Sequence, residues 1–250
     1  MAIPGTDREP VSDDQVQQNE DVVTPAEESA GGSAALQVLR ITDFRYLFMA
    51  NMMMFMAFQM RNVVQSWLAL ELTDSQAWVG VINGSPAIAI ILLGLIGGVA
   101  SDRWPKRDIL LWVRLGLGMV NLVVGYLVVI DVISIWHLLF LSIAQGGAIA
   151  FGMPASQTIV QDVVGRGRLL SAVSLNQSLA TVGGIAGPAV GGALLGVIGV
   201  APVYFVIAAI YVPAIFATWK IKTRTRTERP PGSNPLADIK EALVYVKSSP

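Results

Sequence analysis

The residues of this sequence that could bind a polar ligand stand out because their surroundings are apolar. Arg61 lies in the mostly apolar stretch 44–70. On a helix, at about 100° per residue, its polar neighbours fall with it inside an arc of roughly 160°. They are Gln65, Asn51, Asn62, Ser66 and Gln59. A guanidinium offers five donors in a rigid fork, so Arg61, with Gln65 and Asn62, is the leading candidate for binding an oxyanion or another acceptor on a substrate.

The alternative for Arg61 is pairing between helices or snorkelling to the outer surface. Four further amides lie in apolar stretches and could bind a substrate or bridge two helices; they are Asn83, Gln145, Asn176 and Gln177. Arg114 lies only about two turns from a charged segment. Its guanidinium can reach Asp102, Asp108 or the membrane surface there, so we expect a structural role for it.

The types of residue that the chain contains argue against catalysis. The chain contains no cysteine and one histidine, His137, which stands beside Trp136 and suits an aromatic belt at a membrane interface. The sequence shows no Asp or Glu deep within an apolar stretch, no phosphate-binding glycine loop and no dinucleotide-binding signature. We therefore expect no enzyme active site, no metal, no cofactor and no nucleic-acid partner.

Membrane-spanning helices must position these polar residues. The chain has 250 residues, of which 53% are hydrophobic and 14% are charged, and a helix needs roughly 20 apolar residues to cross a bilayer. Six such runs occur, at approximately 44–70, 77–100, 109–130, 133–160, 169–198 and 200–219. The sequence thus predicts an all-α membrane protein with six transmembrane helices in the lipid bilayer.

Basic residues lie at one end of this predicted bundle. The connections after the second and fourth runs carry Lys and Arg, as do both flanks, whereas the opposite connections contain none. Because Lys and Arg favour the cytoplasmic side, we predict that both chain ends are cytoplasmic, in an inner or plasma membrane. We divide the chain into a disordered acidic tail (1–40), the helical bundle (41–220) and a linker with an amphipathic helix (221–250).

A spaced motif occupies the connection between the second and third predicted helices. It reads G-x-x-x-D-R-x-x-K-R through Gly98, Asp102, Arg103, Lys106 and Arg107. The glycine permits close helix approach, and the charged residues can bond helix ends and hold the cytoplasmic face closed. The motif resembles the loop signature of the major facilitator superfamily, except that Pro105 stands where that family usually has glycine. The resemblance implies that this segment is a gating loop.

A second motif lies in the fifth predicted helix. Gly183, Gly187 and Gly191 recur at every fourth position, beside Pro188 and Gly192. Such a ridge of small residues lets another helix come close. The string resembles the antiporter motif of exporters in the same superfamily.

A third motif of the superfamily is incomplete in the fourth predicted helix. Gln145 and Gly146 match it, but Ser142 stands where the family has an arginine linked with proton coupling. The resemblance therefore leaves the coupling ion open, whether a proton or another ion.

Residues 40–250 as a whole look like the multidrug and enterobactin-exporter branch. The resemblance implies the N-terminal half of a twelve-helix fold, ending before a seventh helix, with the C-terminal half of the same chain as its partner. It implies export of small amphipathic molecules, such as drugs or siderophore-like compounds, by alternating access. An uptake or facilitated-diffusion carrier, or a related membrane protein that does not transport, is the alternative.

Overall fold

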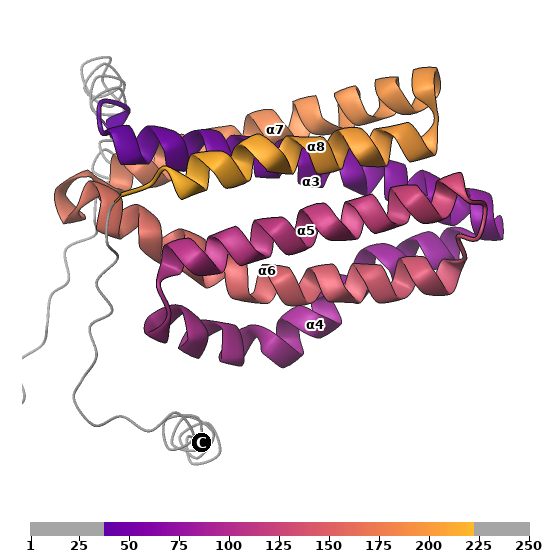
Figure 1. The fold of residues 1–250 in the computed structure, drawn as a ribbon, viewed down its shortest axis with the longest axis horizontal. Coiled ribbons are helices and arrows are strands. Elements are labelled where there is room, and N and C mark those ends of the chain that lie inside the picture. The colour runs from indigo at the N-terminus through magenta and orange to yellow at the C-terminus, as the bar shows by residue number, and fades with distance from the viewer. Residues whose placement is uncertain (1–37, 223–250) are drawn as a thin grey trace, which may run out of the picture.

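The computed structural model describes residues 38–222, apart from the side chain of Asp102, and these residues form helices joined by short turns (Figure 1). Six long helices follow one another: α3 (Thr42–Thr73), α4 (Gln76–Arg103), α5 (Lys106–Val129), α6 (Ile135–Val164), α7 (Leu169–Ile198) and α8 (Val200–Trp219), with a short 3-10 helix, η1 (Arg166–Arg168), before α7. The all-helical prediction is confirmed. The predicted tail (1–40) and linker (221–250) lie almost wholly outside the described residues.

Five of these helices, α4 to α8, have both the length and the apolar composition for crossing a membrane. With 32 residues, or roughly 48 Å at 1.5 Å per residue, α3 is long enough but more polar. Arg61, the charged residue in the interior of α3, is buried in the bundle together with Asn51 and Gln65. Because this polar side of α3 is covered by protein, we count α3 as the remaining span.

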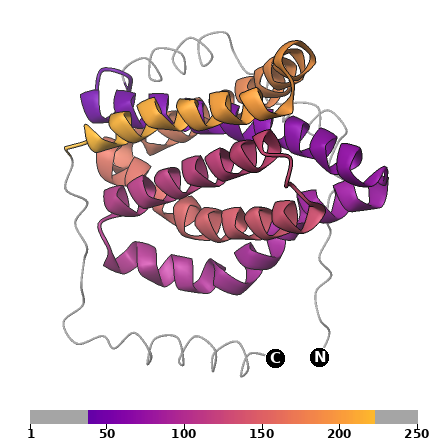
Figure 2. The same cartoon turned by 45° about the vertical axis from the view of Figure 1, so that its right-hand side comes forward.

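The packing of the first three helices repeats in the last three. α4 packs along α6 as α7 packs along α3, and α5 packs on α6 as α8 packs on α3, while α5 and α8 pack on each other. Exchanging α3–α5 with α6–α8 therefore preserves the pattern of neighbours, which is the internal repeat found in many transporter bundles. α4 and α7 lie at opposite edges of the bundle (Figure 1 and Figure 2).

Glycines on α5 make room for two large rings of α8. A Cβ atom at Gly118 would lie 3.3 Å from the Cβ of Tyr211, and one at Gly125 would lie 3.1 Å from the Cβ of Tyr204. Both tyrosines are buried. The two glycines, seven residues apart on one face of α5, thus let α8 approach closely with its tyrosines seated between the helices.

A single glycine turns the chain from α7 into α8. Gly199 is the residue between these helices, with φ 79° and ψ 178°. Gly165 ends α6 in nearly the same conformation, with φ 75° and ψ 168°. Residues with a side chain are strained in this region of backbone space, so glycine permits these tight connections and keeps consecutive helices antiparallel.

Candidate functional site

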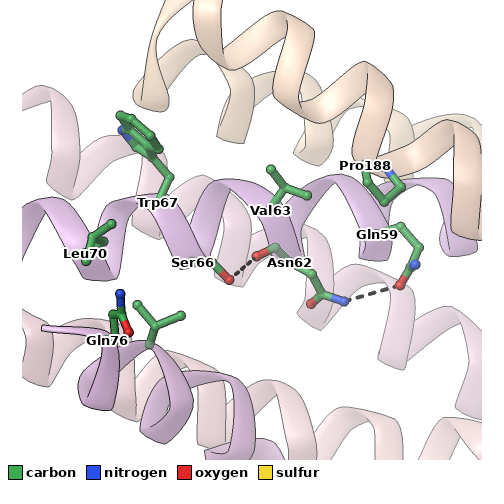
Figure 3. A pocket seen from close by; sticks show the side chains of 9 residues that line it. Gln59, Asn62, Val63, Ser66, Trp67, Leu70, Gln76 and Pro188 are labelled. Atoms are coloured by element: carbon green, nitrogen blue, oxygen red, sulfur yellow. Dashed lines mark hydrogen bonds between the residues drawn. The ribbon is translucent and has the colours of Figure 1, made fainter.

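An open groove of about 590 Å³ runs along α3, beside the start of α4 and the middle of α7 (Figure 3). Its walls are mostly apolar, formed by Val63, Trp67, Leu70, Val79 and Pro188. Its polar lining residues are Gln59, Asn62, Ser66 and Gln76, and none of the lining residues is charged. Apolar walls with a few directed polar groups suit small amphipathic ligands.

Hydrogen bonds connect the polar residues of the groove. The Ser66 hydroxyl donates to the main-chain oxygen of Asn62 at 2.7 Å, and Asn62 Nδ2 donates to Gln59 Oε1 at 3.3 Å (Figure 3). Asn83 of α4 donates from Nδ2 to Ser66 Oγ at 2.8 Å. Asn83 itself is exposed and stands next to the lining residues rather than among them.

Arg61 lies behind this groove. Only 4% of the residue is exposed, and its guanidinium carbon lies 5.7 Å from the centre of the Phe58 ring. It donates to Gln65 Oε1 and, at 3.2 Å, to Asn62 Oδ1. From the sequence we expected Arg61 to face the substrate cavity. In the structure its side chain is buried inside the bundle. Amide acceptors one and four residues along the same helix allow this, because they satisfy part of the buried cation.

Gln65 extends the polar network to α6. Its Nε2 donates to Ser142 Oγ at 3.0 Å. Arg61, Gln65 and Ser142 border a small enclosed cavity, which also meets Asn121 of α5 and Tyr204 of α8. Within residues 38–222, Arg61 Nε, Asn121 Oδ1 and the Tyr204 hydroxyl have no hydrogen-bond partner. Four helices therefore meet around a buried polar centre beside Arg61.

Arg114 forms a second buried cluster. It is completely buried, and its Nη2 donates to Asn51 Oδ1 at 2.9 Å. Asn51 Nδ2 donates to Asn176 Oδ1 of α7 at 3.3 Å, so the cluster joins α5, α3 and α7. Arg114 was expected to have a structural role near the membrane surface, Asp102 or Asp108, and its bond in the described structure goes to an amide acceptor inside the bundle.

The remaining candidate amides lie away from the groove. Gln145 is fully buried on α6, and neither of its side-chain polar atoms has a hydrogen-bond partner in the described part of the chain. Gln177 is exposed on α7 outside the lining residues. Conversely, sequence reasoning missed Trp67 and Gln76 as lining residues, because they come together only through the way α4 starts beside α3.

The glycines of the α7 motif divide between two faces. Gly183, Gly187 and Gly191 are buried against α3, and a Cβ atom at Gly191 would lie 2.9 Å from Met60 Cα. At Gly192 a Cβ atom would meet nothing within 4 Å. The ridge of three glycines therefore seats α7 against α3 at the edge of the groove, where Pro188 forms part of the wall.

We expect Gly191→Ala to weaken the packing of α7 on α3 and Gly192→Ala to be tolerated. The methyl group at position 191 would meet main-chain atoms of Met60, which can move only if α3 moves. Overpacking of this kind costs about 1–3 kcal/mol, so the thermal unfolding midpoint of the purified protein should fall for Gly191→Ala alone. Equal midpoints for the two variants would show that the ridge does not determine this contact.

Two basic residues of the α4–α5 motif bond the ends of other helices. Lys106 Nζ lies 2.7 Å from Asp162 Oδ2 near the end of α6. Arg107 donates to the main-chain oxygen of Trp219 at the end of α8, at 2.7 Å. The start of α5 is therefore tied to two helix ends at the basic end of the bundle.

Gly98 of this motif does not lie at a close approach between two helices, although its residue type predicted one. Around Gly98, a Cβ atom would meet nothing within 4 Å in the described part of the protein. The neighbouring Gly97 lies against the main chain of Ala150 on α6. Close helix approach therefore occurs one residue earlier than expected, and the side chain of Asp102 lies outside what the structure describes.

Comparison with known sequences agrees with the helical architecture. Residues 33–250 match the family described as transmembrane secretion effector, a group of the major facilitator superfamily. The chain belongs to this family. It is therefore a multi-pass membrane protein from a family of transporters and not of enzymes.

Three curated relatives are transporters by name. The enterobactin exporter EntS of Salmonella typhimurium is 25% identical over 211 residues, which are 83% of this chain and 50% of that protein. The staphyloferrin A transporter of Staphylococcus aureus is 23% identical over 188 residues, 71% and 47% of the two chains. The uncharacterized MFS-type transporter YfiS of Bacillus subtilis is 24% identical over 189 residues, 73% and 43%. The chain spans about half the length of these relatives.

Proposed function

We propose that this chain is part of a transporter that exports small amphipathic molecules by alternating access. The observation that carries the proposal is the groove along α3, in which apolar walls surround Gln59, Asn62 and Ser66. A molecule with an apolar body and a polar group can contact both kinds of surface there. Drugs and siderophore-like compounds belong to this class.

One end of the groove supports this use, because Gln59 lies near the middle of α3, while the other end reaches the turn between α3 and α4. In transporters with repeated halves, the substrate binds near the middle of the membrane between the halves. The relatives are about twice as long as this chain. We propose that a C-terminal half faces α3, α4 and α7 and closes the groove from the opposite side.

Export is favoured over uptake by two observations. The glycine ridge of α7 carries the exporter-type motif, and EntS is named as an exporter of enterobactin. The acidic residues among 38–222 lie at or near helix ends, so we propose that any carboxylate that couples transport to a proton or another ion lies in the other half.

The basic end of the bundle is proposed to be the cytoplasmic gate. The bonds of Lys106 to Asp162 and of Arg107 to the Trp219 carbonyl hold the ends of α5, α6 and α8 together. If these bonds form in only one state of the cycle, they bias its equilibrium. The same excess of Lys and Arg supports a plasma-membrane protein with both ends in the cytoplasm.

We expect the full-length protein to speed the loss of amphipathic dyes from cells that lack their own exporters. Cells would be loaded with Nile red, which is uncharged, or with carboxyfluorescein, which is an anion. Trp67→Ala should slow dye loss because Trp67 lines the groove. Trp112→Ala is the matched control, since Trp112 is exposed on α5 outside the lining residues.

Three outcomes separate the functions. Faster loss that depends on Trp67 supports export through the groove, whereas faster entry of dye added outside supports an uptake carrier. Loss of both dyes at the rate of cells without the protein would contradict transport of this class of molecule. Membrane levels of both variants should equal those of the unaltered protein.

A further inference from the structure

We propose that the groove selects molecules that present hydrogen-bond acceptors, anions above all, because Arg61 turns the amides of the groove so that their N–H groups face the ligand. This inference rests on the proposed transport function and names the substrate class of the same groove. Asn62 is the residue that contacts the ligand, and Arg61 is a positioning residue behind it.

The first step is the orientation of the Asn62 amide. An asparagine can present either its oxygen or its NH2 group, but a guanidinium has only donors. Arg61 donates to Asn62 at 3.2 Å, so the Asn62 oxygen must face Arg61. The NH2 group then faces the opposite way, and Figure 3 shows it directed along the groove toward Gln59.

The Asn62 amide in turn determines the orientation of the Gln59 amide. The Asn62 NH2 group donates to Gln59 Oε1 at 3.3 Å, which occupies the oxygen and leaves the Gln59 NH2 group for a ligand. A Cβ atom at Gly184 of α7 would lie 3.8 Å from this Gln59 nitrogen, and glycine offers it no side-chain acceptor. In the described residues no hydrogen bond from Gln59 Nε2 to protein is formed. Donors of two neighbouring amides therefore point into one groove.

The third step is the charge behind the groove. The lining residues carry no charge, and the Arg61 guanidinium is a single amide away from the groove. The acidic residue of α3 nearest to Asn62 in the sequence is Glu71, in the last turn of the helix. It lies nine residues away, or roughly 13 Å along the helix, much further than the adjacent Arg61. In surroundings of low dielectric constant a buried cation acts over several ångströms. An anion in the groove is therefore attracted and a cation repelled, although the guanidinium contacts neither.

The walls determine the rest of the ligand. Trp67 is 54% exposed and lies with Val63 on the side of α3 that faces Pro188 of α7 (Figure 3). Trp67 follows Asn62 by five residues, so the two side chains point about 140° apart around α3 at about 100° per residue. A flat apolar body can therefore lie along Val63, between the indole ring and the amides, with its acceptor group directed to Gln59 and Asn62. The class that fits is an aromatic or other apolar body that bears a carboxylate or a sulfonate.

Two fluorescent probes with the same aromatic body test this selectivity. 1-Anilinonaphthalene-8-sulfonate carries a sulfonate, and N-phenyl-1-naphthylamine is the same molecule without it. Each would be titrated into the purified full-length protein in lipid nanodiscs, with energy transfer from tryptophan as the readout. The signal that disappears in Trp67→Phe reports binding in the groove. We expect the sulfonate probe to bind at least tenfold more tightly than the uncharged probe by this signal.

Asn62→Asp is the decisive variant because it keeps the size of the side chain and an oxygen for Arg61, but replaces the donor by a second acceptor with a negative charge. We expect it to weaken binding of the sulfonate probe at least tenfold and to leave the uncharged probe unchanged. Arg61→Gln should reduce the preference for the sulfonate without abolishing binding of the uncharged probe. Gln177→Ala, which removes an exposed amide outside the groove, is the matched control and should change neither affinity.

The outcomes separate this inference from the proposed function. Equal affinities for the two probes, or a sulfonate affinity that survives Asn62→Asp, would overturn the acceptor selectivity and leave the groove as a binding site. Absence of any Trp67-dependent signal with either probe would remove the groove itself from the transport proposal. If Asn62→Asp fails to give folded protein, Asn62→Ala takes its place, with the same expected loss of preference for the sulfonate.

Discussion

Gly146→Ala should severely disturb the native packing, whereas Gly147→Ala, one residue further along α6, should be almost without effect. A Cβ atom at Gly146 would lie 2.6 Å from the Cα of Pro86 and would also collide with its main-chain carbonyl group. At Gly147 the Cβ atom would meet only the Cδ1 of Leu93, at 3.4 Å. A terminal methyl group of leucine can turn aside, but the main chain of α4 cannot.

The expected cost of Gly146→Ala is at the upper end of overpacking, about 3 kcal/mol, since relief requires α4 to shift along its contact with α6. The measurement is the yield of monodisperse protein in size-exclusion chromatography and its thermal unfolding midpoint. Gly147→Ala, in the same detergent, supplies the control for replacing a helix glycine. A Gly146→Ala protein with the yield and midpoint of Gly147→Ala would show that the α4–α6 contact is looser than described.

The number and the limits of the helices were predictable because the thickness of a bilayer dictates the length of the apolar runs that cross it. Apolar runs bounded by charge or by turn residues gave the limits of α7 and α8 and came within about four residues for the others. The spacing of Gly183, Gly187 and Gly191 likewise indicated one face of α7 for close packing. It could not show that α3 is the partner, because a ridge of small residues fits any helix.

The division of the polar arc of α3 was beyond sequence reasoning. The first half of the arc, Arg61, Gln65 and Asn51, is buried in the bundle. The second half, Asn62, Ser66 and Gln59, lines the groove. A helical wheel shows that six residues share one side, but the boundary between bundle and groove depends on where α5, α6 and α8 pack. The residue with the strongest chemistry was therefore expected on the wrong half of the arc.

The partners of the buried arginine on α5 were hidden for a similar reason. Sequence proximity suggested Asp102 and Asp108 for Arg114, whereas Asn51, 63 residues away, accepts its hydrogen bond. Tyr204 and Asn121 gave no spacing signal, because a single polar residue in an apolar helix has no pattern of its own. Such contacts depend on how the helices pack together, which the sequence does not display.

We expect Asn51→Leu to be among the most destabilising single substitutions in the bundle, while Asn51→Asp keeps or raises stability. Asn51 Oδ1 accepts from the completely buried Arg114 at 2.9 Å. Leucine would remove that acceptor and leave a buried, charged donor without its hydrogen bond, which costs at least about 3 kcal/mol. Aspartate has the same size and places a carboxylate at the same position. Asn176 can turn its amide to donate to it, at the cost of the bond from its Nδ2 to the Ala172 main-chain oxygen.

Asn121→Leu serves as the control for losing a buried amide, since Asn121 Nδ2 donates only to the main-chain oxygen of Leu117. Its cost should be about 1–3 kcal/mol, smaller than that of Asn51→Leu. The unfolding midpoint in a single detergent, measured for all variants, gives the order.

The double variant Asn51→Leu/Arg114→Met decides whether the buried charge is the cause. Replacing both members of a buried polar pair by apolar residues of similar volume is often neutral, whereas removing one member is strongly destabilising. The double variant should therefore unfold at a higher temperature than Asn51→Leu alone, although it contains one more substitution in the core. If Arg114→Met brings no recovery, the loss in Asn51→Leu comes from packing around α3, α5 and α7 and not from an unpaired guanidinium. Recovery together with a stable Asn51→Asp would show that Arg114 lacks only a counter-charge among residues 38–222.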